Sequence, residues 1–428
     1  MGFWSVLGLV IGSQVGSGVF MSPVSLASYG TLAFLGWAVS GVGAVLLALV
    51  FAQLSMRVSR AGGPHTFIKQ AFGRRAAFFM AWTYWVISWV STTAVLIAAI
   101  GYLTPLLGRS GPLTMLGMEI ALLLTVTALN LRGVQSAGRA EFYLSLLKVL
   151  PLILIPLMGL WYFQSEHLAA PPADQVWSMF PGAVALTFWG FIGIETATTA
   201  AGAVDQPAKT IPRAVVFGTV FVALLYMLNS VGVMGLIPSA QLAASSAPYA
   251  DAARMMMGTG WDLVIGLMAF LVCVGTLNAW ILTSGQIAAG AAQDGLFPAI
   301  FQKTNRHGAP LFGLLISSLG IIPMLLFTLD PSLGAQINWV IDISVTTFLF
   351  VYGACVVAFL KILSREAGGV SVKHGVLGAG ALLFCLAMIA CNSPMVAGLS
   401  LLFVASGIPV YLWRSRQGHF STQVACEL

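Results

Sequence analysis

A succession of apolar segments, each long enough to cross a lipid bilayer, constrains the fold of this chain more than any other feature. A membrane-spanning helix needs about 20 mainly apolar residues, and segments of this kind recur along almost the whole sequence. Only 7% of the 428 residues are charged, whereas about 25% are charged in a soluble domain. The sequence therefore predicts an all-α polytopic membrane protein. We expect about twelve transmembrane helices, at residues 3–29, 31–55, 78–107, 112–131, 139–163, 180–203, 213–236, 259–290, 310–328, 336–361, 374–391 and 394–413.

Glycines interrupt two of these segments near their middle. The first segment contains Gly16-Ser17-Gly18, and the sixth contains Trp189-Gly190-Phe191-Ile192-Gly193-Ile194-Glu195. Glycine destabilises a helix by about 1 kcal/mol relative to alanine, and unwound backbone at membrane depth is tolerated only where it lines a cavity or is buried in protein. Paired interruptions of this kind indicate the binding site of a secondary transporter.

The positions of the two interruptions also predict the domain organisation. Breaks in helices 1 and 6 are typical of an inverted five-helix repeat followed by extra helices. Repeat one would span residues 3–163, repeat two residues 180–361, and the two extra helices residues 374–413. No long linker divides the chain, so we expect residues 1–428 to form a single transmembrane domain. The first segment lacks the features of a cleaved secretory signal, so we expect it to be retained.

The distribution of basic residues predicts the orientation in the membrane. Among the predicted outer loops only Arg109 and Arg254 are basic, and Lys148 lies within a predicted span, whereas the other Lys and Arg residues lie in the predicted inner loops and tail. Basic loops are retained on the cytoplasmic side, so both termini should be cytoplasmic. The net charge of +6 mostly reflects this bias, and we infer no nucleic-acid partner from it.

The two interruptions carry complementary backbone groups. Amides freed around Ser17 and Gly18, at the positive end of the following half-helix, would bind a carboxylate. Carbonyls freed near Trp189 and Ile192 would accept hydrogen bonds from an ammonium group. Together they would hold the head group of an amino acid. Alternatively, the glycines only permit close packing of helices.

Aromatic and acidic side chains near the interruptions are further candidates. Trp189 and Trp280 lie in the middle of their segments, and an aromatic face attracts a cation, although packing or interfacial anchoring would explain either residue equally well. Glu195 follows the second interruption, and ionisable groups within a membrane are usually functional. The alternative for Glu195 is a structural carboxyl bonded to a neighbouring helix.

Signatures of an enzyme are missing from the sequence. The five histidines are scattered, the five cysteines show no metal-binding spacing, and no nucleophile has a base beside it. We therefore expect no catalytic residues, no metal and no cofactor. An ion channel or an integral-membrane enzyme remains the alternative of a different class, but covering aromatics favour a site that occludes one ligand.

Four motifs stand out along the sequence, namely Gly16–Phe20, Ala61–His65, Phe188–Glu195 and Gln293–Pro298. Together they resemble the amino acid-polyamine-organocation superfamily. Within it the chain is most similar to the bacterial basic amino acid/polyamine antiporters of the arginine/agmatine type, and the resemblance implies the leucine-transporter-type fold.

The resemblance implies a role for individual residues around the ligand. Ser17 and Gly18 match the residues that hold the substrate carboxylate, while the carbonyls of Trp189 and Ile192 match those that receive its amino group. Trp189 also matches an aromatic residue that folds over the bound substrate, and Trp280 matches the one that stacks on its side chain.

Other positions match a gate and a second set of contacts. The gating residues on the cytoplasmic side would be Tyr84, Glu195 and Tyr352, here called the gate triad. The remaining substrate-binding positions are Ile87, Ser88, Thr92 and Ser344. Thr92 stands where the arginine exchanger has an asparagine, which leaves the identity of the substrate open.

The resemblance also implies the activity and its location. We expect a secondary active amino acid transporter of the bacterial inner (plasma) membrane, exchanging a basic amino acid for its amine or polyamine product by alternating access. A neutral amino acid permease and a proton-coupled amino acid symporter remain alternatives. The expected partners are a small-molecule amino acid or amine and the lipid bilayer, and pairing as a homodimer stays open.

Overall fold

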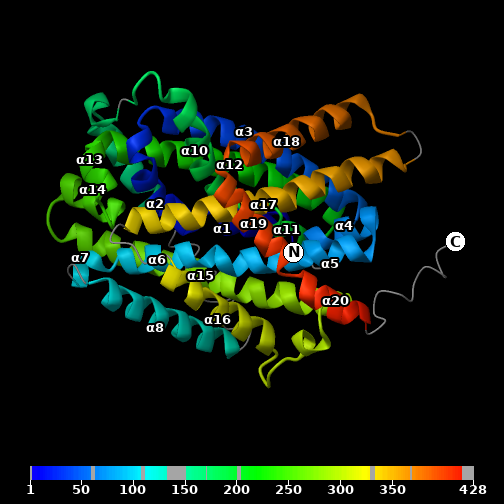
Figure 1. Cartoon of the computed structure of the whole chain (residues 1–428). Helices are drawn as coiled ribbons and strands as arrows, with labels where there is room; N and C mark the ends of the chain where they lie inside the picture. The colour runs from blue at the N-terminus through cyan, green and yellow to red at the C-terminus, as the bar shows by residue number, and fades with distance from the viewer. Residues whose placement is uncertain are drawn as a thin grey trace.

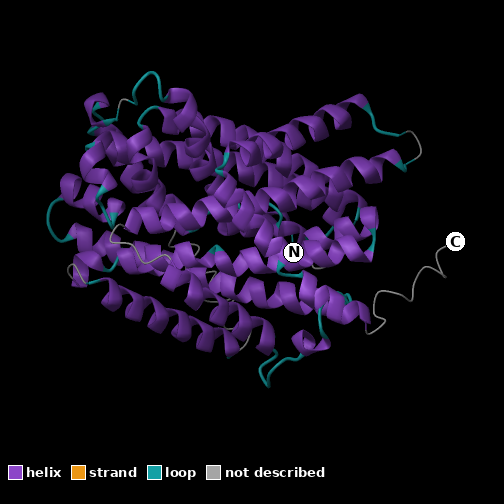
Figure 2. Cartoon of the chain, viewed as in Figure 1, coloured by secondary structure: helices purple, strands orange, loops and turns teal. Residues whose placement is uncertain are grey.

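The computed structural model describes residues 2–58, 63–107, 111–132, 151–169, 171–199, 204–327, 333–366 and 369–416. Within these ranges the regular structure is helical, apart from one isolated bridge between Thr304 and Pro310, as Figure 2 shows. Among the residues that the structure describes, nine helical segments are long and apolar enough to cross a membrane, and three shorter apolar helices accompany them. The prediction of an all-helical polytopic membrane protein is confirmed. Part of the predicted fifth span, residues 139–150, lies outside the described residues.

Most of the apolar segments are single helices. These are α3 (Leu32–Arg57), α8 (Pro112–Leu131), Pro151–Trp161, α12 (Pro207–Leu236), α15 (Trp261–Gln293), α16 (Leu311–Phe327), α17 (Leu333–Ser364) and α18 (Val372–Cys391). The others are divided between two helices. The divided segments are α1 (Phe3–Gln14) with α2 (Ser17–Leu26), α5 (Arg74–Val90) with α6 (Thr92–Gly101), α10 (Val176–Phe188) with α11 (Thr196–Thr199), and α19 (Pro394–Ala405) with α20 (Ile408–Arg416).

The long helices run roughly side by side, and short helices cover the ends of the bundle (Figure 1). One end carries α7 (Thr104–Leu107), α13 (Ser239–Ala243) and α14 (Pro248–Met257), and the opposite end carries α4 (Pro64–Phe72). Four 3-10 turns complete the described elements. They are η1 (Ala27–Tyr29), η2 (Ser165–His167), η3 (Trp189–Phe191) and η5 (Ala299–Gln302).

Burial separates a central group of helices from a peripheral one. The segment formed by α5 and α6 is 94% buried over its most apolar stretch, and α17 is 72% buried. By contrast, α8 and α18 are 22% buried and the α19–α20 segment only 11%. Apolar side chains left exposed on the outer helices suit a lipid surface, because the bilayer core is itself apolar.

The predicted interruptions in helices 1 and 6 are both present. The first segment breaks between Gln14 and Ser17, and the sixth breaks after Phe188. Both broken segments pack against α12, and the sixth also packs against α3 and α17. The inverted relation between the two predicted repeats stays a prediction.

Candidate functional site

The first break is held open by side chains from α12. The carbonyl of Gln14 accepts the hydroxyl of Tyr226 at 2.7 Å and the amide of Gly16 at 2.9 Å, and the Gln14 side-chain amide donates to Thr219 at 3.2 Å. These bonds keep the end of α1 from continuing into α2. The first amides of α2 consequently have no intrahelical acceptor, and such a helix start attracts anions. The side chain of Ser17 lies outside the described residues.

Gly18 lies directly against the indole of Trp189. A β-carbon added at Gly18 would sit 2.7 Å from both Cδ1 and Nε1 of Trp189, which is too close for any side chain without moving the ring. The structure thus brings together two residues that lie far apart in the sequence, one from each broken segment. Trp189 covers the start of α2, where the predicted carboxylate site lies.

The second break contains a turn that only glycine adopts easily. After α10 and η3, Gly193 has φ +107°, a conformation that L-residues with a side chain rarely reach. Its added β-carbon would lie 3.1 Å from the carbonyl oxygen of Ser13, so the two broken segments touch here. The Trp189 carbonyl already accepts the Ile192 amide at 3.2 Å. Ile192 has an extended backbone conformation, so its carbonyl group does not point along the helix axis as it would in a continuous helix.

The gate triad forms one fully buried hydrogen-bonded group. Tyr84 donates to Oε1 of Glu195 at 2.8 Å, and Tyr352 donates to Oε2 at 2.6 Å. The backbone amide of Gly193 donates to the Tyr352 hydroxyl at 3.3 Å. One carboxyl therefore links α5, α17 and the second break, and a buried group with this many partners fixes their relative positions. The role of the triad as a gate stays a prediction.

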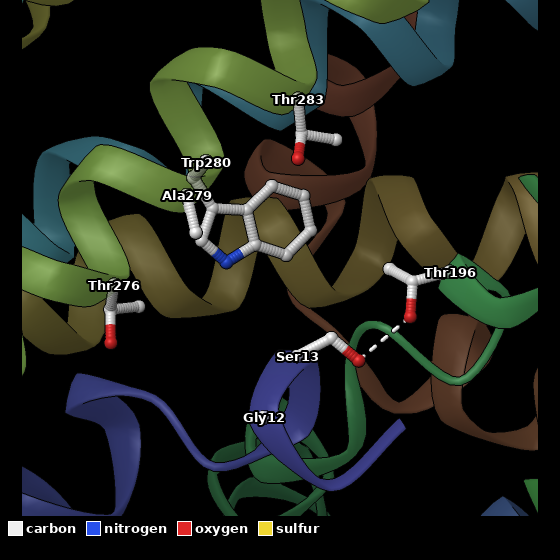
Figure 3. Close-up of a pocket in the computed structure, with 7 residues that line it drawn as sticks. All are labelled: Gly12, Ser13, Thr196, Thr276, Ala279, Trp280 and Thr283. Carbon is white, nitrogen blue, oxygen red and sulfur yellow. Dashed lines mark hydrogen bonds between the residues drawn. The ribbon is translucent and has the colours of Figure 1, made fainter. Parts of the chain in front are cut away.

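A cavity opens beside both breaks, between α1, α11 and α15 (Figure 3). Its volume is about 40 Å³, well below the roughly 300–1,000 Å³ that is common for whole small-molecule sites, so it has room for one small chemical group. We call it the hydroxyl cavity. Its lining residues are Gly12, Ser13, Thr196, Thr276, Ala279, Trp280 and Thr283.

Trp280 is the one predicted site residue that lines the hydroxyl cavity. Figure 3 shows its indole between Thr276 on one side and the bonded pair Ser13 and Thr196 on the other. The indole also contacts the ring of Phe348, with ring centroids 6.3 Å apart. Phe348 in turn contacts Tyr352 at 5.9 Å. Aromatic rings thus connect the cavity wall to the gate triad.

The predicted contacts on α5 and α6 do not line this cavity. The segment is interrupted at Ser91, and the hydroxyl of Thr92 donates to the carbonyl of Ser88 at 2.7 Å. The carbonyl of Ile87 accepts the Ser91 amide. The hydrogen-bonding groups of Ile87, Ser88 and Thr92 are therefore at least partly occupied by bonds within their own helical segment. Ser344 is fully buried on α17, and its hydroxyl has no hydrogen-bond partner among the described residues.

Sequence reasoning missed most of the residues that line the hydroxyl cavity. Ser13 precedes the first break and Thr196 follows the second, so proximity to the breaks was an available signal. Thr276, Trp280 and Thr283 are spaced by four and three residues, which places them on one face of α15. Among the described residues no group of three or more His, Cys, Asp or Glu side chains is arranged to hold a metal ion.

Comparisons with known proteins give a consistent result. A family model described as amino acid permease matches residues 1–416. The putrescine transporter PotE of Haemophilus influenzae is 31% identical, over 84% of this chain and 83% of that protein. PotE of Escherichia coli K12 is 29% identical over 89% of each chain. The cadaverine/lysine antiporter of Escherichia coli K12 is 30% identical, over 78% of this chain and 77% of that protein.

Proposed function

This chain belongs to the amino acid permease family, and we propose that it is an antiporter that exchanges a basic amino acid for its amine or polyamine product. It is a multi-pass membrane transporter and not an enzyme. Relatives named for putrescine and for cadaverine and lysine support amines and basic amino acids as the class of cargo. Arginine and agmatine are members of that class by chemistry.

The contact between the two broken segments carries the proposal. Gly18 touches Trp189 and Gly193 touches Ser13, so the start of α2 and the second break lie beside each other. The carboxylate of an amino acid would bind the amides of Ser17 and Gly18, and its α-ammonium would bind the carbonyls of Trp189 and Ile192. Trp189 and Trp280 would cover the ligand.

Alternating access would follow from the gate triad. Glu195 follows the second break and accepts hydrogen bonds from tyrosines of α5 and α17. These bonds would hold the cytoplasmic side of the binding site closed. We propose that breaking them lets one repeat rock against the other around the bound ligand. Ser344, whose buried hydroxyl has no partner among the described residues, would supply a further polar contact.

The proposed location is the bacterial inner membrane with both termini in the cytoplasm, because basic residues gather in alternate loops. Introduced cysteines test this orientation. On a background with the exposed Cys391 and Cys426 replaced by serine, we expect an impermeant thiol reagent added outside intact cells to label Arg254→Cys but not Arg75→Cys. The reverse pattern would place the termini outside.

Counterflow in proteoliposomes tests the class of cargo. Vesicles loaded with unlabelled ornithine, lysine or arginine should accumulate labelled putrescine or cadaverine transiently above equilibrium. Leucine and glutamate inside the vesicles should not drive this accumulation. Counterflow of neutral amino acids at equal or higher rates would instead make the protein a neutral permease.

A further inference from the structure

We propose that the hydroxyl cavity binds the terminal ammonium group of the cargo, and that it selects primary diamines and diamino acids over guanidinium compounds. This inference rests on the proposed function and adds the chemical group that the site recognises. It assigns the selection to Ser13, Thr196 and Thr276, none of which belongs to the head-group site.

The cavity lies close enough to the head-group site for one ligand to reach both. An added β-carbon at Gly16 would contact the Thr276 side chain at 3.0 Å, so the cavity wall adjoins the first break. Thr196 follows Glu195 directly in the sequence and starts α11. A ligand whose carboxylate binds the start of α2 would therefore extend its side chain into the cavity.

The protons of three of the four cavity hydroxyls are directed to the protein itself. Thr276 donates to the carbonyl of Val272 at 3.1 Å. Ser13 has the carbonyls of Val10 and Gly193 within 3.0 and 3.2 Å, and Thr196 lies 2.7 Å from both the Gly193 carbonyl and the Ser13 hydroxyl. A hydroxyl has one proton and two lone pairs. Because these protons are donated to main-chain and hydroxyl oxygens, the remaining lone pairs of the three hydroxyl oxygens can accept hydrogen bonds from a ligand in the cavity.

The lining also contains no charge. None of its residues is acidic or basic, and none carries a side-chain amide. A group that donates several hydrogen bonds suits these hydroxyl oxygens, and an ammonium has three donors and no acceptor. The indole face of Trp280 attracts the same cation. A carboxylate would find few donors there, only the Thr283 hydroxyl and the indole N–H of Trp280, so the cargo enters with its amine end toward this cavity.

The arrangement of acceptors favours an ammonium over a guanidinium. A guanidinium is a planar fork of five donors that matches paired acceptors such as a carboxylate. Here single hydroxyl oxygens come from three elements, α1, α11 and α15, around the indole (Figure 3). Three tetrahedrally arranged donors suit such a site better than a flat fork does.

Competition for uptake of labelled 1,4-diaminobutane in proteoliposomes tests the selectivity of the unmodified protein. Unlabelled ornithine and lysine should compete at least tenfold more strongly than arginine, which has the same amino acid head group but a guanidinium at its far end. Competition by arginine at equal concentrations would overturn the proposed selectivity, whatever the variants do.

Two variants test the residues. Thr276→Val and Thr196→Val each replace a hydroxyl by a methyl group of similar size, and we expect each to raise the KM for 1,4-diaminobutane about tenfold, the usual effect of losing a hydrogen bond to a charged group. The matched control is Thr125→Val, which removes a hydroxyl from an exposed position on α8 and should leave the KM unchanged. Monodispersity on size exclusion reports correct folding.

The outcomes separate this inference from the proposed function. If the unmodified protein exchanges basic amino acids and amines but both threonine variants keep their KM, only the role of the hydroxyl cavity is overturned. If the unmodified protein carries neither class, the proposed function and this inference are both wrong.

Discussion

Replacing Glu195 by glutamine changes one buried atom from a hydrogen-bond acceptor to a donor. In the structure both tyrosines donate to the carboxyl, at 2.8 and 2.6 Å, and Tyr352 also accepts the Gly193 amide. The glutamine oxygen can keep one tyrosine, but its NH2 group cannot accept from the other. Glu195, Tyr84 and Tyr352 are at most 1% exposed, so water cannot supply the missing acceptor.

The size of the effect follows from the lost bond. A hydrogen bond to a charged group contributes about 1.5–3 kcal/mol, which corresponds to roughly 10- to 150-fold in an equilibrium constant. We expect Glu195→Gln to slow exchange at least tenfold because the closed arrangement becomes less populated. The proposed head-group contacts are elsewhere, so the substrate Kd should change by less than about threefold.

The pH dependence has a defined sign. Protonation of Glu195 adds a donor where both tyrosines already donate, so acidification should weaken the same arrangement that glutamine weakens. The rate of the unmodified protein should therefore approach that of Glu195→Gln as the pH falls, while the variant gives a flatter profile. Radiolabel exchange in proteoliposomes across pH, with binding measured in parallel, provides the test.

Two tyrosine variants serve as internal controls. Tyr352→Phe removes the bond to Glu195 and the acceptor of Gly193, whereas Tyr84→Phe removes one bond, so the first should slow exchange more. An unchanged rate and pH profile in Glu195→Gln would refute the reasoning and leave Glu195 as a structural carboxyl.

Three further predictions concern the breaks and the covering aromatics. Gly18→Leu should insert normally but abolish uptake, because a β-carbon there already lies 2.7 Å from Trp189; normal transport by a correctly inserted variant would contradict the proposed head-group site. Trp280→Leu should weaken binding of cationic substrates more than of neutral ones, since the indole face attracts cations; equal losses in a binding assay would indicate packing alone. Tyr226→Phe removes the hydroxyl that holds the Gln14 carbonyl at 2.7 Å and should destabilise the protein by about 1 kcal/mol, seen as a lower thermal midpoint; an unchanged midpoint would show that the break does not depend on this bond.

Sequence patterns predicted the backbone of the site better than its side chains. The glycines at 16, 18 and 193 mark the two breaks because helix propensity and close contact both act locally. The family resemblance also named Tyr84, Glu195 and Tyr352, which the structure brings into hydrogen-bond contact.

The hydroxyl cavity could not be found in the same way. Ser13 and Thr196 are 183 residues apart in the sequence, and their pairing depends on how α1 packs beside α11. Serine and threonine hydroxyls also bond readily to their own helix, so composition does not distinguish Thr92, which does this, from a residue that faces a cavity. Contact between distant segments decided which hydroxyls line the site.

The dependence of uptake on substrate inside the vesicle tests antiport most directly. Initial uptake of labelled 1,4-diaminobutane should be at least tenfold faster into proteoliposomes loaded with ornithine or lysine than into vesicles loaded with buffer alone. An imposed proton gradient should not replace the internal amino acid. Equal uptake into empty vesicles, or uptake driven by the proton gradient alone, would contradict exchange and make the protein a uniporter or a symporter.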